Sequence, residues 1–262
     1  MMNHPSFWTG VFFFLLGGFI GSFLHVCIFR LPIGLSVVYP GSSCSHCKSP
    51  IRWYDNIPLL SSWILTFKCR SCKQSFSKEP WMIEFLSAIW ALICFLKFKT
   101  HQELILSLIF GSTLLAIFFT DLKHRIIPNQ LIAVSLLLGV TTHGLFFFFG
   151  KNPGFLTSLL GMIIGFSSFW LLSEVFYRIK GYEGLGGGDV KMAACIGLFL
   201  GIQGLLVSVL LASLLGLSVS LPGVFLYKTG KKFPIPFGPF LALGSYLFLL
   251  FQNEISLILP IV

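Results

Sequence analysis

Long apolar segments alternate with short polar ones along almost the whole chain. Because a hydrocarbon core of ~30 Å needs about 20 apolar residues in a helix, segments of this length predict transmembrane helices. Eight such segments can be delimited, at residues 7–29, 81–98, 104–120, 131–149, 155–177, 190–200, 205–227 and 235–252. The sixth is short for a complete span. The pattern therefore predicts an all-α polytopic membrane protein with about eight transmembrane helices.

The only long polar stretch lies between the first and second apolar segments. It divides the chain into a first transmembrane helix at 1–29, an insert at 30–80 and a transmembrane core at 81–262. The insert is the single candidate for a separate subdomain.

Composition excludes a soluble enzyme. Of the 262 residues, 55% are hydrophobic and only 10% are Asp, Glu, Lys or Arg, whereas a globular domain carries about 25% charged residues. The net charge of +9 has a topological explanation, because Lys and Arg accumulate in the cytoplasmic loops of membrane proteins. We therefore expect a lipid bilayer around the chain and no nucleic-acid partner.

Basic residues predict the orientation. The insert and every second loop after it hold fifteen Lys and Arg residues, against three in the alternate loops. This places the insert in the cytoplasm and both termini outside. The first apolar segment has no Lys or Arg before Phe7 and has Arg30 after it, the reverse of a secretory signal, so we expect it to be retained as a helix. Three GxxxG pairs suggest close helix packing: Gly17/Gly21, Gly161/Gly165 and Gly197/Gly201.

Four of the seven cysteines form two CxxC pairs in the insert, at Cys44/Cys47 and Cys69/Cys72. Two such pairs can place four thiolates around Zn²⁺ at about 2.3 Å. Two disulfides are the alternative, but the predicted cytoplasmic location is reducing and favours the metal. Four thiolates leave no open coordination position, so the zinc would be structural. The other cysteines lie in apolar segments and are expected to behave as small hydrophobic residues.

Two acidic residues stand at predicted membrane boundaries beside helix-breaking sequences. Asp121 ends the third apolar segment ahead of Pro128, and Asp189 precedes the sixth and follows the run Gly186–Gly188. Alone, either acid could be a helix cap or an ion-pair partner. If the bundle brings them together, the two carboxylates would share one proton, so that one acts as a base on water and the other as an acid. That is the chemistry of aspartic peptide hydrolysis. The glycine run completes neither GxxxxGK[ST] nor GxGxxG, which argues against nucleotide binding.

These features resemble the bacterial type 4 prepilin peptidases, a family of GxGD aspartic membrane proteases. The similar stretches occur in the family's order over nearly the whole chain: 21–24, 44–47, 53–61, 69–72, Asp121 with 128–129, 186–191 and 236–239.

The resemblance implies a multi-pass protein of the bacterial cytoplasmic (inner) membrane with its active site facing the cytoplasm. Asp121 and Asp189 would be the catalytic pair, and Gly186, Gly187, Gly188 and Lys191 would form the active-site loop. The substrates would be prepilins or pseudopilins, which lose a basic leader. The new N-terminus would then be methylated if the chain also has the family's N-methyltransferase activity, which uses S-adenosylmethionine.

Two other functions are considered. Paired acids in a helical bundle also relay protons, as in a proton-coupled transporter or channel. Both acids lie at one predicted face instead of the midplane, and no transporter-type repeat is evident, so the peptidase is preferred. A zinc-binding assembly factor would leave Asp121 and Asp189 without a role.

Overall fold

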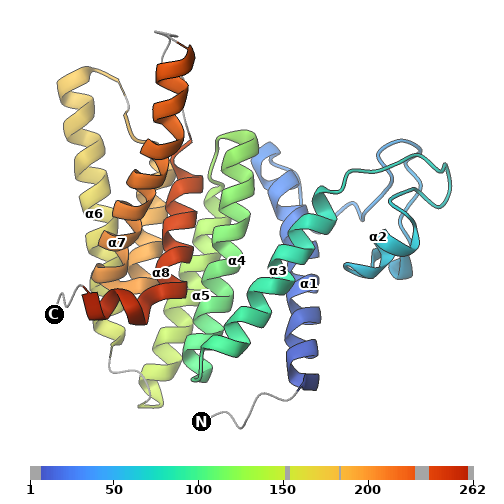
Figure 1. Cartoon of the computed structure of the whole chain (residues 1–262), viewed down its shortest axis with the longest axis horizontal. Helices are drawn as coiled ribbons and strands as arrows, with labels where there is room; N and C mark the ends of the chain where they lie inside the picture. The colour runs from blue at the N-terminus through green and yellow to red at the C-terminus, as the bar shows by residue number, and fades with distance from the viewer. Residues whose placement is uncertain (1–6, 151–153, 183, 228–235, 259–262) are drawn as a thin grey trace. The chain divides into compact units, whose positions relative to one another are not determined.

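Helices make up almost all of the regular structure. The structure is a computed structural model that describes residues 7–150, 154–182, 184–227 and 236–258. Its elements, shown in Figure 1, are α1 (Phe7–Arg30), η1 (Leu31–Ile33), η2 (Trp53–Asn56), α2 (Leu60–Ile64), α3 (Glu79–Lys97), α4 (His101–His124), α5 (Asn129–Phe148), α6 (Phe155–Lys180), α7 (Gly187–Tyr227) and α8 (Gly238–Ile258). Within these residues the only β-type pairings are two isolated bridges. The predicted all-α class is confirmed.

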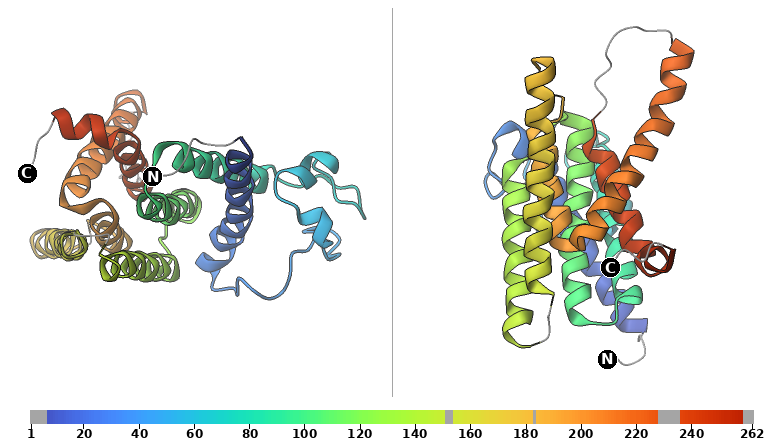
Figure 2. Two further views of the ribbon diagram at one scale, coloured as in Figure 1. Left: turned by 90° about the horizontal axis from the view of Figure 1, so that it is seen from below. Right: turned by 90° about the vertical axis from the view of Figure 1, so that its left-hand side faces the viewer.

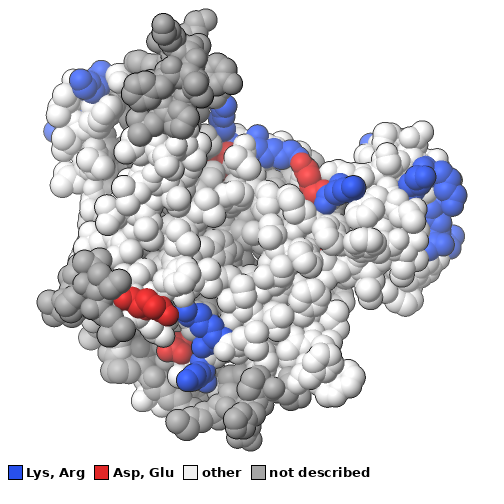
Figure 3. Space-filling model, in the orientation of Figure 1, with Lys and Arg blue, Asp and Glu red and all other residues white. Residues whose placement is uncertain are grey.

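Six helices in the described part are long and apolar enough to cross a membrane: α1 with η1, α3, α4, α5, α6 and α7 up to Ser220. Broad areas of the face in Figure 3 carry no charged side chain, as expected for a surface in contact with lipid. The chain is a multi-pass membrane protein.

The difference between six and eight spans arises at the C-terminal end. The predicted sixth and seventh segments are the two halves of α7, which meet at Gly201 with φ 69° and ψ −174°. The halves run in different directions from this point (Figure 2). The first half is about 21 Å long at 1.5 Å per residue, which explains why its apolar segment is short. The predicted eighth segment corresponds to α8, which has a non-helical backbone at Phe251 and is not among the six spans found in the described residues.

Some predicted features fall outside the described residues. These are Lys151, the basic residues Lys228, Lys231 and Lys232, and the start of the eighth segment at Ile235.

The chain divides into two compact units, Met1–Leu108 and Ile109–Val262. In the first unit α1 packs on α3. A Cβ atom added at Gly17 would lie 2.5 Å from the backbone oxygen of Ser87, and one added at Gly21 would lie 2.6 Å from Cα of Glu84. No side chain fits there, so this GxxxG pair allows the two backbones to approach closely.

In the second unit α7 packs against α5, α6 and α8. A Cβ atom at Gly161 would lie 2.3 Å from the oxygen of Gly197, and one at Gly197 would lie 2.0 Å from the oxygen of Gly161. The rings of Phe110 on α4 and Phe199 on α7 stack with centroids 4.8 Å apart. The backbones of α6 and α7 are thus in direct contact, and α7 is the centre of the unit.

Candidate active site and metal centre

Asp121 lies in the last turn of α4, where the sequence ends the helix. Arg125 adopts a left-handed backbone conformation with φ 56°, and its N–H donates to the oxygen of Asp121 at 2.8 Å. Pro128 has extended dihedral angles and is the N-cap residue of α5. The residue before a proline is disfavoured in a helix, so α4 cannot continue through Ile127. Asp121 is only 6% exposed, although it lies directly before this turn.

Asp189 lies in the first turn of α7. The backbone N–H of Asp189 donates to the oxygen of Gly186 at 3.0 Å, which starts the helix directly after the glycine run. A negative side chain is favoured at this position by the helix dipole. The glycine run therefore sets where α7 begins and where its first carboxylate points.

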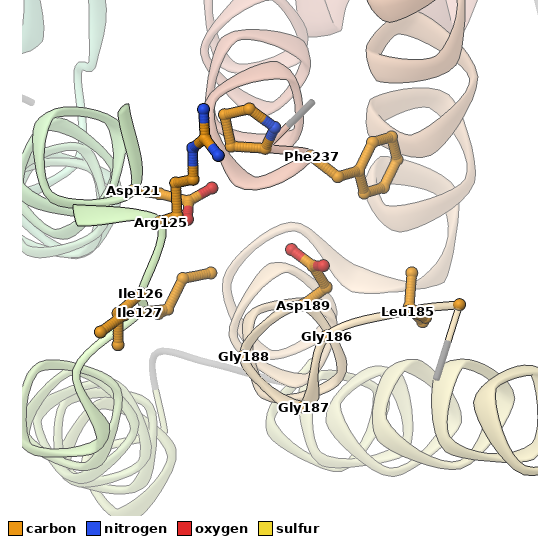
Figure 4. A pocket seen from close by; sticks show the side chains of 12 residues that line it. Asp121, Arg125, Ile126, Ile127, Leu185, Gly186, Gly187, Gly188, Asp189 and Phe237 are labelled. Atoms are coloured by element: carbon orange, nitrogen blue, oxygen red, sulfur yellow. The ribbon is translucent and has the colours of Figure 1, made fainter. Parts of the chain in front are cut away.

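The two aspartates line one pocket of about 570 Å³ within the second unit. Figure 4 shows both carboxylates projecting into it, Asp121 from α4 and Asp189 from α7. The remaining lining residues are Arg125, Ile126, Ile127, Gly184, Leu185, Gly186, Gly187, Gly188, Pro236 and Phe237. The wall is thus mainly apolar or glycine, with two carboxylates and one guanidinium.

Each carboxylate is held by a backbone N–H from a glycine. Gly238 donates to Asp121, and Gly186 donates to Asp189. A Cβ atom added at Gly238 would lie 2.6 Å from Oδ2 of Asp121, and one added at Gly186 would lie 3.3 Å from Oδ2 of Asp189. At both positions the backbone lies close to a carboxylate. At Gly238 the approach is so close that no residue with a side chain would fit.

Only the glycines of the predicted active-site loop line the pocket, and the lysine makes a hydrogen bond elsewhere. Gly186, Gly187 and Gly188 line the pocket, but Lys191 is not among its lining residues. The ammonium of Lys191 donates instead to Oδ1 of Asn129 at 2.7 Å. It thereby joins the start of α7 to the start of α5.

Several residues of the site were not singled out from the sequence. Arg125 follows Asp121 by one helical turn, a spacing that could have indicated it. Phe237 and Gly238 belong to the Pro-Phe-Gly-Pro stretch, which contributed only to the family resemblance. Nothing in the sequence indicated that Ile127 packs against the glycine run, where a Cβ atom on Gly188 would lie 2.9 Å from Cβ of Ile127.

The four insert cysteines come together as one cluster, with their sulfur atoms all within 4.8 Å of one another. The Sγ atoms of Cys44 and Cys72 are 3.9 Å apart, as are those of Cys47 and Cys69. A tetrahedron with Zn–S bonds of about 2.3 Å has edges of roughly 3.8 Å, whereas a disulfide requires about 2.05 Å. The cluster fits a four-thiolate metal site.

The two CxxC pairs have the same local structure. The backbone N–H of the residue after each pair donates to the backbone carbonyl oxygen of the first cysteine in that pair at 3.0 Å. These bonds run from Lys48 to Cys44 and from Lys73 to Cys69. Both lysines have left-handed backbones, with φ 57° and 59°. An isolated antiparallel bridge closes each turn, Ser43 with Pro50 and Lys68 with Ser75. Below, residues 43–50 and 68–75 are called the two cysteine knuckles.

Ionisation of the thiols differs within the cluster. The backbone N–H groups of Cys72 and Ser71 lower the pKa of Cys69 to about 6, which favours its thiolate. The N–H of Gln74 has the same effect on Cys72, but burial and the neighbouring thiols outweigh it and raise the pKa of Cys72 to about 11. A cation would relieve this mutual repulsion and allow all four sulfurs to ionise.

Two family models match the chain. Residues 15–98 match the bacterial peptidase A24 N-terminal domain, and residues 108–221 match the type IV leader peptidase family.

Curated relatives agree with the family models. The chain is 36% identical to the prepilin leader peptidase/N-methyltransferase of Myxococcus xanthus, over 86% of the chain and 65% of that protein. It is 32% identical to the protein of that name from Aeromonas hydrophila, over 93% and 91% of the two chains. Identity to the Pseudomonas aeruginosa protein of that name is also 32%, over 92% and 90%. No solved structure matches.

The resemblance seen in the sequence is confirmed, and the comparisons support prepilin processing and give no support to the transporter alternative. The chain belongs to the type IV leader peptidase family.

Proposed function

We propose that the chain is a membrane aspartic endopeptidase that removes the basic leader of type 4 prepilins or pseudopilins. The reaction would occur at the cytoplasmic face of the bacterial inner membrane. The observation that carries this proposal is that Asp121 and Asp189, from helices distant in sequence, both project into one pocket (Figure 4).

The two carboxylates would act as a pair. Two like charges at one site disfavour double ionisation, so the pair holds one proton between its members. The ionised member takes a proton from a water molecule as that water attacks the scissile carbonyl carbon. The protonated member donates to the carbonyl oxygen. As the C–N bond breaks, the first member gives the proton that it took from water to the amide nitrogen, and the second recovers its proton from the hydroxyl of the tetrahedral intermediate. The N–H groups of Gly238 and Gly186 hold the two carboxylates for this exchange.

The pocket also suits the expected substrate. A prepilin has a basic leader followed by an apolar helix, so its scissile bond lies at a membrane boundary. The apolar side chains of Ile126, Leu185 and Phe237 line the same pocket as the carboxylates. The glycine run would allow an extended substrate backbone to approach them.

The direct test is leader release from a prepilin peptide by detergent-solubilised protein, with the cleavage position read by mass spectrometry. Asp121→Ala and Asp189→Ala should each abolish cleavage while the protein remains inserted in the membrane. Loss of a general acid or base typically lowers a rate by about 10²–10⁴-fold. Activity above about a tenth of wild type in either variant would remove that residue from the pair.

Zinc is the metal that the cysteine cluster would hold. Cys44, Cys47, Cys69 and Cys72 would supply a complete four-thiolate shell, so the ion would stabilise the fold of the insert and take no part in peptide hydrolysis. An insert of about 50 residues cannot bury a large core, which makes such a stabilising ion useful.

N-methylation of the new N-terminus is the second activity in the relatives' names. If this chain has it, the methyl donor would be S-adenosylmethionine. The relatives' names are what supports this activity, and we assign none of the described residues to the donor. Transfer of a labelled methyl group from S-adenosylmethionine to a cleaved pilin peptide would test it independently of cleavage.

A further inference from the structure

The short helix α2 in the insert exposes its apolar side chains and buries its polar ones. Leu60, Trp63 and Ile64 are 56%, 64% and 74% exposed, while Ser61 and Ser62 are buried. Positions i, i+3 and i+4 form one face of a helix, so the three apolar residues make a continuous stripe on the outside. This is the reverse of what a water-soluble subdomain shows.

The start of α2 is attached at membrane depth to the helices of its own unit. The backbone N–H of Leu59 donates to Oε2 of the buried Glu84 on α3 at 2.8 Å. Glu84 lies five residues after the start of α3, or about 7.5 Å along its axis. On α1, a Cβ atom at Gly18 would lie 3.4 Å from the side chain of Leu59, and Gly18 is twelve residues, about 18 Å, before the end of that helix. Because α1 and α3 are both candidate spans, α2 lies beside transmembrane segments.

Backbone polar groups around α2 are satisfied within the protein. Leu59 has a non-helical backbone with φ 65°, and Glu84 accepts its N–H. The N–H groups of Leu60 and Ser61 donate to the oxygens of Pro58 and Ile57, at 2.7 and 3.1 Å. Irregular backbone is tolerated at membrane depth only where it is buried in protein or lines a water-filled cavity, and Leu59 is buried. The hydrogen bond from Leu59 explains why a carboxylate is buried at Glu84.

Aromatic contacts join the exposed stripe to the surface of α3. The rings of Trp63 and Trp81 lie 5.9 Å apart, and Trp81 stacks on Phe85 at 5.2 Å. Phe85 is itself exposed on a transmembrane helix, so the apolar stripe of α2 continues a lipid-facing surface. The ammonium of Lys78 lies 5.7 Å from the Phe67 ring beside this cluster. Tryptophan together with lysine is typical of the boundary between acyl chains and headgroups.

We propose that α2 is a re-entrant interfacial helix, whose Leu60, Trp63 and Ile64 side chains insert into the acyl-chain region of the leaflet next to the cysteine knuckles. The insert would therefore be fixed to the membrane through α2, with lipid as its partner. Amphipathic helices of this kind typically bury their apolar face about 5–10 Å below the headgroup boundary; the Leu59 contacts lie about 7.5 Å along α3 and about 18 Å along α1 from the ends of these helices nearest the insert. This inference does not depend on the peptidase function.

The test uses tryptophan fluorescence of the full chain in phosphatidylcholine nanodiscs. Lipids brominated on their acyl chains quench tryptophans within the membrane, and acrylamide quenches those in water. Trp63→Phe should remove part of the lipid-quenched emission and leave the acrylamide-quenched emission unchanged. The matched control is Trp53→Phe, since Trp53 lies in η2 of the same insert and is 81% exposed. Trp53→Phe should remove part of the acrylamide-quenched emission and leave the lipid-quenched emission unchanged. Metal content should be the same in both variants.

A Trp63→Phe protein that loses only acrylamide-quenched emission would overturn the proposal, because Trp63 would then be in water. A second measurement needs no substitution: a photoactivatable phospholipid should label the wild-type peptide that contains residues 60–64. Absence of lipid labelling on that peptide, with labelling of the exposed face of α3 in the same sample, would show that lipid does not contact the stripe and would also overturn the proposal.

Discussion

The cysteine cluster and the aspartate pocket each bring together residues from two segments of the chain, but they are built in different ways. Each cysteine knuckle is a short turn with its own hydrogen bonds, and the second repeats the first nearly atom for atom in its backbone pattern. The aspartates have no such local motif. They line one pocket because α4 and α7 belong to one helical unit, in which Phe110 of α4 stacks on Phe199 of α7.

The two centres therefore depend on different parts of the sequence. A knuckle needs its cysteines and a residue that tolerates a left-handed backbone, as Lys48 and Lys73 do. The pocket needs glycines that permit close approach, at Gly188 against Ile127 and at Gly238 against Asp121. Substitutions that damage one centre should leave the other intact, which can be tested directly.

The largest expected effect is in the aspartate pair. Asp121→Asn and Asp189→Asn should each lower the cleavage rate by about 10²–10⁴-fold. The double variant should be no worse than either single variant, because residues that act as one unit are strongly non-additive. Single-turnover cleavage of a prepilin peptide measures this. Rate losses that multiply in the double variant would mean that the two acids act independently. Zinc content serves as the control and should stay at the wild-type value.

The next effect is on the metal. Purified protein should contain about one zinc ion per chain, and Cys44→Ser, Cys47→Ser, Cys69→Ser or Cys72→Ser should each lose most of it, since three thiolates no longer complete the shell. Elemental analysis gives the stoichiometry. Cleavage should fall less than in the aspartate variants, because the knuckles and the pocket lie in different compact units. A metal-free wild-type protein with two disulfides in its mass spectrum would contradict the prediction.

The contrast between the two centres also explains what the sequence could predict. CxxC spacing is local, so the four cysteines could be named in advance, and the structure brings their sulfur atoms together. The apolar segments likewise located α1, α3, α4, α5 and α6. The pairing of Asp121 with Asp189 could only be a conditional expectation, because it depends on which helices pack. Phe237 and Gly238 were missed as site residues for the same reason, whereas Arg125 lies one helical turn after Asp121 and could have been named from that spacing.

Two further differences have physical causes. The predicted sixth and seventh spans form one element because Gly201 allows the chain to turn through a left-handed conformation without a polar loop. The exposed face of α2 could not be predicted because its five residues lie within a polar insert. A helix that short shows too little periodicity to reveal which face is buried.

A smaller effect distinguishes close approach from simple flexibility in the glycine run. Gly188→Val should reduce cleavage by about tenfold or more, since its side chain would meet Ile127 and overpacking costs typically 1–3 kcal/mol. Gly187→Val tests substrate approach separately, because an added Cβ atom there meets no protein atom within 4 Å although Gly187 also lines the pocket. Leader-release rates compare the two. Equal rates in Gly188→Val and wild type would show that the run is an ordinary flexible loop.

An equal loss in Gly187→Val would have another meaning. It would indicate that the bound substrate occupies the open space beside Gly187, since the protein itself leaves that space empty. Zinc content and membrane insertion should be unchanged in both valine variants.

The smallest expected effect concerns the hydrogen bond from Lys191 to Asn129, which joins the starts of α7 and α5. It connects the first turn of α7, which carries Asp189, to the start of α5, which follows the turn after Asp121. The bond should therefore fix the position of α7 relative to α5 at the pocket without contacting the reacting atoms. Lys191→Met and Asn129→Leu should each weaken cleavage modestly, and a double-mutant cycle should give a coupling energy of about 0.5–1.5 kcal/mol. Lys191→Arg should recover part of the rate, because a guanidinium can also donate to the amide oxygen. A rate loss in Lys191→Met as large as that in Asp189→Asn, with no recovery in Lys191→Arg, would instead assign the ammonium a direct part in the reaction. Strictly additive losses would show that the hydrogen bond does not couple the two turns, and the pocket would then depend on helix packing alone.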